Sequence, residues 1–172
     1  VVQYEFDILG NFTRANYPDS TNKQYHYNET GLSLANNPHA LTGITTENGL
    51  RYSSYGYAVN GRVNLSQRHK GDGTVVEKTT IDYPTINQPV VTLPHGEVIT
   101  YGIVDEGPYR RITSMANGPR MMQVAYSGGA VSQTTIALGT TKYVYAADYL
   151  SERYEAFGKP EERKFVTVRD TN

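Results

Sequence analysis

The sequence contains no cysteine and no tryptophan, and only 19% of its residues are charged. The absence of cysteine excludes disulfide bridges, thiolate metal sites and a cysteine nucleophile. Lysine and arginine number 16 against 17 aspartates and glutamates, so the basic surface typical of a nucleic-acid-binding protein is missing. No apolar run reaches the roughly 18 residues of a membrane-spanning helix. We therefore expect neither a nucleic-acid partner nor a membrane span.

Tyrosine, threonine and valine are abundant instead, a composition typical of β-sheets. Short runs that alternate apolar and polar residues follow one another at intervals of about 8–12 residues. Asn60-Gly61 between two such runs is a strong hairpin signal, because both residues accept positive φ angles. Residues 51–58, 62–69 and 74–83 are thus predicted to form an antiparallel meander.

These patterns predict an all-β protein, an antiparallel barrel or sandwich of about ten short strands with little helix. Residues 1–172 are long enough for a single β domain. The proline-rich segment 84–94 is predicted to be an edge or crossing segment, because proline cannot donate to a central ladder, and it is the best candidate for an internal boundary. Residues 146–157 have some helical character, which competes with a final strand. No repeat period is evident.

The sequence contains none of the common catalytic signatures: no phosphate-binding loop, no paired-histidine zinc motif and no serine nucleophile elbow. Acidic residues occur as the neighbours Asp105-Glu106 and Glu161-Glu162. Neighbouring side chains on a strand point to opposite faces, so this spacing does not create an acid–base pair. We therefore predict a binding protein and not an enzyme.

The four histidines are not spaced as metal ligands usually are, and the sequence identifies no metal. A haem iron needs only one axial histidine or tyrosine in an apolar pocket, so a haem cofactor is a hypothesis. Tyrosine is also common at recognition surfaces, because it combines a large apolar body with a polar tip. The plainer alternatives are solvated histidines and strand-filling tyrosines. The candidate ligand-binding residues are His26, His39, Tyr25, Tyr27, Tyr52 and Tyr55.

Three stretches resemble the transferrin-binding-protein-type surface barrels, a family of Gram-negative lipoproteins and haemophilin-like secreted haemophores. Residues 50–57 (LRYSSYGY) look like the family's aromatic strand that ends in Tyr-Gly-aromatic. Residues 93–102 (LPHGEVITYG) look like the opening of its eight-stranded barrel, and residues 154–158 (YEAFG) are similar to its closing strand. The resemblance implies an exported protein that binds haem or a host protein.

Two hypotheses for the function follow, beside a third that we rank last, an enzyme that acts on a polysaccharide through scattered carboxylates. The first is a secreted or surface-exposed bacterial binding protein that captures haem or a host protein. The second is a structural subunit of an extracellular filament or capsid that self-associates by strand exchange at sheet edges, with residues 84–93 or 1–10 as the exchanged arm. Both place the protein outside the cell or at its surface. There, the acceptor triplets at Asn11, Asn28 and Asn64 are available to a glycosylating source.

Overall fold

The computed structural model describes residues 1–146 and 149–167, and all of their regular structure is β-strand. The strands are β1 (Gln3–Phe6), β2 (Phe12–Asn16), β3 (Asn22–Tyr27), β4 (Leu41–Thr45), β5 (Arg51–Tyr57), β6 (Val63–His69), β7 (Val75–Thr85), β8 (Gln88–Thr92), β9 (Val98–Glu106), β10 (Tyr109–Asn117), β11 (Arg120–Ser127), β12 (Ala130–Ile136), β13 (Gly139–Ala146), β14 (Tyr149–Glu155) and β15 (Arg163–Val166). Among these residues, no helix long and apolar enough to cross a membrane is found.

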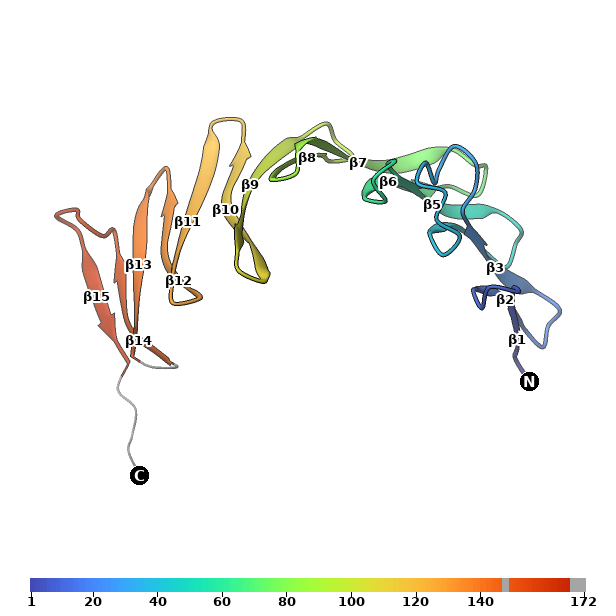
Figure 1. The fold of residues 1–172 in the computed structure, drawn as a ribbon, viewed down its shortest axis with the longest axis horizontal. Helices are drawn as coiled ribbons and strands as arrows, with labels where there is room; N and C mark the ends of the chain where they lie inside the picture. The colour runs from blue at the N-terminus through green and yellow to red at the C-terminus, as the bar shows by residue number, and fades with distance from the viewer. Residues whose placement is uncertain (147–148, 168–172) are drawn as a thin grey trace, which may run out of the picture. The chain divides into compact units, whose positions relative to one another are not determined.

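The fifteen strands form one open sheet in which the order of strands follows the order of the chain (Figure 1). The all-β prediction is therefore confirmed, and so is the meander, since β5 pairs with β6 and β6 with β7, both antiparallel. The prediction of a barrel or sandwich of about ten strands is wrong. Among the described residues, no strand pairing closes the sheet. Spacing along the chain reveals hairpins, but it does not reveal whether the first and last strands meet.

Two local predictions also need correction. Residues 149–155 form strand β14 where helical character had been considered, and residues 147–148 lie outside the described part of the chain. Pro84 and Pro89 lie inside β7 and β8, which are interior members of the strand order. The proline-rich segment is therefore neither an edge nor a crossing. A proline lacks only its own N–H donor, so neighbouring residues can still pair.

The chain divides into two compact units, which we describe separately. Unit 1 comprises residues 1–82 and 91–97, and unit 2 comprises residues 83–90 and 98–172. The single-domain assignment and the boundary at residues 84–94 stay predictions.

Unit 1 repeats one turn geometry that sequence inspection missed. In each copy the first N–H donates to the fifth carbonyl, and the fourth N–H donates to the first carbonyl. The fourth residue has a positive φ, which explains why glycine occupies it in every copy except at Ser20. The copies are residues 7–11, 17–21, 46–50, 58–62, 70–74 and 93–97. The copies share their backbone hydrogen bonds, but only their fourth position favours one residue type. The repeat is therefore not visible as a period in the sequence.

Unit 2 uses shorter turns. Two residues connect each pair of strands from β9 to β13, and Gly128-Gly129, with φ angles of 56° and 83°, is an example. Two positive φ angles in a two-residue loop match the right-handed twist of the flanking strands. The hairpins of unit 2 therefore reverse with almost no chain outside the sheet.

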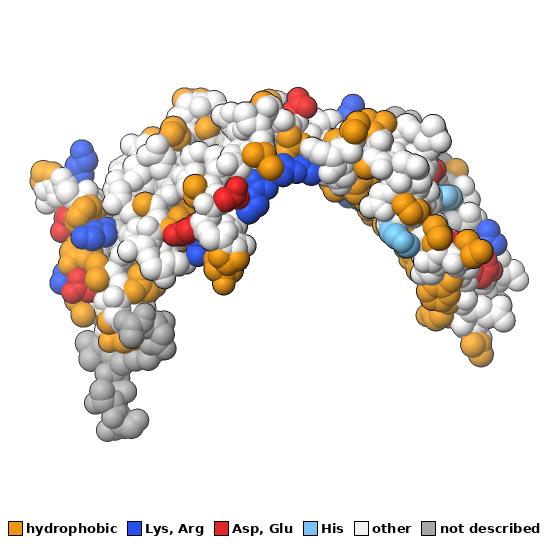
Figure 2. Space-filling view, viewed as in Figure 1, with side chains coloured by type: hydrophobic (Ala, Val, Ile, Leu, Met, Phe, Trp, Pro, Cys, Tyr) orange, Lys and Arg blue, Asp and Glu red, His pale blue; other side chains and the backbone are white. Residues whose placement is uncertain are grey.

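Neither unit contains a large apolar core. The buried apolar side chains of the described residues are Ala15 and Ala40, and every buried residue lies in unit 1. The chain exposes 11423 Å², whereas two separate compact domains of half its mass would together expose about 10,000 Å². Figure 2 shows hydrophobic side chains on the surface of both units. The sheet is thus a layer whose apolar side chains largely face outward.

Candidate functional site

Strands β3–β5 bring three of the four predicted tyrosines to one face of unit 1. Tyr25 pairs with Ile44, and Ile44 pairs with Ser53. Directly paired residues share a face, and residues two apart on a strand share a face as well. Tyr27 therefore lies on the same face as Tyr25, and Tyr55 lies on the same face as Ser53.

Tyr52 joins this face because the strand is irregular at that point. Ile44 pairs with Ser53 but Thr45 pairs with Arg51, so Tyr52 is the extra residue of a β-bulge. The guanidinium of Arg68, a partner of Ser53, lies 5.4 Å from the centre of the Tyr52 ring. In an undistorted strand, Tyr52 would face the side opposite to Tyr55. We call the face that carries Tyr25, Tyr27, Tyr52 and Tyr55 the aromatic face.

The two predicted histidines lie elsewhere. His26 lies between Tyr25 and Tyr27 and therefore faces the opposite side, where its Nε2 is 2.8 Å from the Thr45 hydroxyl. Burial lowers the pKa of His26, and the nearby Arg51 charge adds to this effect. His39 is exposed in the loop before β4, and its Nδ1 is 2.7 Å from the side-chain Oδ1 of Asn11. The structure thus gives the two histidines different partners.

The aromatic face extends to residues that the sequence prediction did not include. The Phe12 ring contacts the rings of Tyr4, Phe6 and Tyr25 at centroid distances of 5.7, 5.6 and 4.8 Å. Tyr4 and Phe6 are nevertheless 64% and 63% exposed. The alternation of aromatic residues at positions 4 and 6 was a signal for this cluster, but it identified only a half-buried strand.

The opposite side of β4 and β5 carries a polar cluster around Arg51. Its guanidinium donates to both carboxylate oxygens of Glu29, at 3.0 and 2.7 Å, and to the Thr42 carbonyl at 2.8 Å. The buried Thr42 hydroxyl donates to Glu29 at 2.7 Å. The Arg51 hydrogen bonds are the main cause of the lowered pKa of Glu29, which favours the ionised form. The cluster is therefore a charged pair whose polar groups are well satisfied.

The polar cluster continues into the next hairpin. Arg51 Nε donates to the Ser54 hydroxyl at 3.2 Å, and that hydroxyl lies 3.0 Å from His69 Nε2. His69 Nδ1 is 3.3 Å from the Gly73 carbonyl, which can only accept. A neutral His69 that donates from Nδ1 and accepts at Nε2 satisfies both contacts. The chain of hydrogen bonds joins β5 to the β6–β7 turn and positions these strands.

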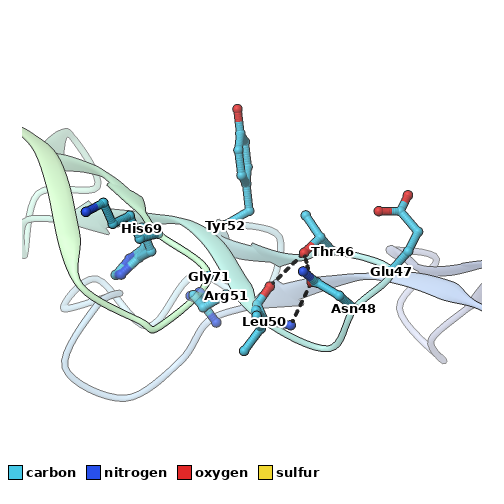
Figure 3. A pocket seen from close by; sticks show the side chains of 9 residues that line it. Thr46, Glu47, Asn48, Leu50, Arg51, Tyr52, His69 and Gly71 are labelled. Atoms are coloured by element: carbon cyan, nitrogen blue, oxygen red, sulfur yellow. Dashed lines mark hydrogen bonds between the residues drawn. The ribbon is translucent and has the colours of Figure 1, made fainter.

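A cavity of about 390 Å³ lies beside this cluster, between the 46–50 and 70–74 turns. Figure 3 shows Tyr52 and Glu47 on one side of the strands and Leu50 and Arg51 on the other. The lining includes the base His69, the cation Lys70 and the anion Glu47. His69 is already engaged by Ser54 and Gly73, so the arrangement favours a structural role for these side chains.

The described residues contain no group of three or more histidine, aspartate or glutamate side chains that could hold a metal ion. The haem hypothesis, the transferrin-binding-type resemblance and the individual ligand residues stay predictions. No family model matches the chain, and no curated protein is significantly similar to it.

Proposed function

We propose that this chain is a structural subunit, not an enzyme, that forms part of an extracellular β-sheet assembly by associating with further copies of itself. Unit 1 would supply the contact through its aromatic face. The observation that carries the proposal is that large aromatic side chains stay exposed while small polar residues occupy the buried positions.

Self-association would cover the exposed apolar side chains of such a sheet. A sheet with an apolar face is stable when that face is buried against another element, and in unit 1 the exposed rings gather at β1–β3. The net charge of −1 leaves little repulsion between copies. Burial of apolar area contributes about 25 cal/mol per Å², so covering several aromatic rings offsets part of the cost of association.

Light scattering coupled to size-exclusion chromatography tests the proposal. We expect the mass of the full chain to rise with concentration. The double variant Tyr4→Ser/Phe6→Ser should shift it toward the monomer, while Val75→Ser with Val76→Ser, a matched pair of exposed apolar residues on β7, should not. A wild-type chain that stays monomeric at all concentrations, folds cooperatively and binds no hydrophobic dye would overturn the proposal.

Capture of haem or a host protein is the second candidate. The shared face of the four tyrosines supports a protein partner, and the exposed His39, which lies elsewhere, supports haem as the ligand. The haem version predicts a shifted Soret band when haemin is added. That band should be lost in His39→Ala and kept in His26→Ala, because His26 is half-buried and hydrogen-bonded to Thr45. Absence of a shifted band with the wild-type chain would remove haem as the ligand.

A further inference from the structure

Unit 2 contains a trough of about 1080 Å³ along strands β10–β13. Its walls include Tyr109 and Arg111 on β10 and Tyr143 and Tyr145 on β13. The Gly128-Gly129 turn forms part of its rim. Binding sites for small ligands usually enclose about 300–1,000 Å³, so the trough is large enough for an oligomeric ligand.

The register of unit 2 places the tyrosines on the same face as Arg111. The Arg111 guanidinium lies 5.4 Å from the Tyr109 ring centre and 4.9 Å from that of Tyr126. Two residues before Tyr126, Val124 pairs with Thr134, which in turn pairs with Thr141. Alternation from Thr141 puts Tyr143 and Tyr145 on this face too.

Arg111 is held in a fixed orientation. Its Nε forms a 2.5 Å ion pair with Glu106, and its side chain is only 19% exposed. A Cβ atom on Gly129 would lie 3.5 Å from Arg111 Nη2, so the glycine leaves the guanidinium edge uncovered at the rim. The rings of Tyr109 and Tyr126 flank a planar group that offers several hydrogen-bond donors.

The charged side chains of the trough indicate which class of ligand it can bind. Arg111 and Lys142 both belong to the lining of the trough. Glu106 pairs with Arg111, and the Lys142 ammonium is directed to the rings of Tyr154 and Phe157 on the other face of β13. Ser127 and Ser132 add hydroxyl groups to the lining. The trough therefore combines flat tyrosine rings, hydroxyls and a neutralised donor–acceptor pair. A ligand with apolar ring faces and many hydroxyl groups complements each of these features.

The geometry points to a binding site for a neutral oligosaccharide in this trough, with sugar rings against Tyr109, Tyr143 and Tyr145. Arg111 and Glu106 would hydrogen-bond the sugar hydroxyls. This site does not depend on the proposed self-association, because it lies in unit 2 and uses other side chains.

A glycan array of neutral and acidic oligosaccharides, followed by calorimetric titration of the best neutral glycan, tests the inference. The chain has no tryptophan, so tyrosine fluorescence reports binding directly. We expect Tyr109→Ala to weaken binding about tenfold, the effect of losing one aromatic contact. Tyr52→Ala, which removes an exposed tyrosine of unit 1, should leave the affinity unchanged.

Arg111→Lys is the second variant, because it keeps the charge and loses the planar donors. We expect it to weaken binding while the circular dichroism spectrum stays that of the wild type. Failure of the wild-type chain to bind any neutral glycan would overturn the inference. Equal losses with Tyr109→Ala and Tyr52→Ala, or binding of acidic glycans alone, would overturn it as well.

Discussion

Unit 1 buries residues and unit 2 does not, although both are single antiparallel layers. The difference lies in one connection. Residues 28–40 of unit 1 form a long loop that folds back onto β5, with Leu32 and Leu34 hydrogen-bonded to the backbone of Tyr57. The loop also delivers Glu29 to Arg51. Unit 2 has two-residue turns from β9 to β13, and none of its described residues is buried.

The comparison shows two ways to stabilise a sheet without an apolar core. Unit 1 uses a half-buried charged pair with satisfied partners, and the loop supplies the Glu29 side chain of that pair. Unit 2 uses cations stacked on aromatic rings, with Arg111 on Tyr126 and Lys164 on Tyr154 as examples. Each such contact contributes about 0.5–1 kcal/mol at an exposed site. Stability should therefore be concentrated in unit 1 and spread thinly over unit 2.

Arg51→Ala should have the largest effect. It removes both Arg51 hydrogen bonds to Glu29 and the one to the Thr42 carbonyl, so that the Thr42 hydroxyl is the remaining donor to the carboxylate, and we expect the free energy of unfolding to fall by about 2 kcal/mol. Arg153→Ala removes an ion pair of unit 2 that is exposed on both sides, and it should cost about 0.5 kcal/mol. Urea denaturation measures both losses. Equal losses would contradict the contrast between the two units.

Gly129→Ala should come next, because it forces a side chain into a positive φ of 83°. We expect a loss of about 1–1.5 kcal/mol. Hydrogen exchange should show it as faster opening of β11 and β12 alone. The same change at Gly61 in unit 1, where φ is 77°, is the matched control. Its effect should extend into the strands around the polar cluster. If faster hydrogen exchange were confined to the turn in both variants, the predicted difference between the two units would be wrong.

Acid should lower the stability of unit 1, and this loss should persist at high salt. Hydrogen bonds from Arg51 hold the pKa of Glu29 below its ordinary value of 4.5. The unfolded chain thus binds a proton more readily, so this stabilisation is complete above about pH 4.5 and is lost as the pH falls further. Lys164 lowers the pKa of Glu152 in unit 2 similarly, but the Lys164 side chain is 44% exposed against 23% for Arg51, so salt should screen that pair more.

The measurement is urea denaturation from neutral to acidic pH, at low and at high salt. Glu29→Gln should flatten the pH dependence at both salt concentrations, whereas Glu152→Gln should flatten it only at low salt. If high salt abolished the effect of Glu29→Gln on the pH dependence, the polar cluster would be screened like the exposed ion pairs, which would contradict the prediction.

Ser53→Ala should have the smallest effect, and of opposite sign. Ser53 is 2% exposed, and its hydroxyl has no hydrogen-bond partner among the described residues. Its removal should stabilise the chain by about 0.5 kcal/mol. Ser54→Ala breaks the contacts to Arg51 and His69, and it should cost about 1 kcal/mol. A loss of stability in Ser53→Ala would show that the Ser53 hydroxyl has a partner.

Local chemistry made the strands and the hairpins predictable. Asn60-Gly61 indicated the position of its turn correctly, although of the two residues Gly61 alone has a positive φ, and alternation indicated β5 to β7. Closure of the sheet could not be read from spacing, because it depends on contacts between strands far apart in sequence. The four tyrosines were named together as candidate ligand-binding residues, but their shared face could not be read from alternation. It depends on a bulge at Tyr52, and one extra residue reverses the alternation. Glu29 was not singled out, because its partner lies 22 positions away.

The match between strand order and chain order has a consequence for how the protein folds. Each strand pairing of the described residues joins neighbours in the sequence, so contact order is low and each hairpin needs only a short loop to close. Folding can then begin at any of several turns and spread outward from it, as in linear repeat arrays. Such a chain can gain or lose a complete hairpin through evolution without disturbing the pairing of distant strands.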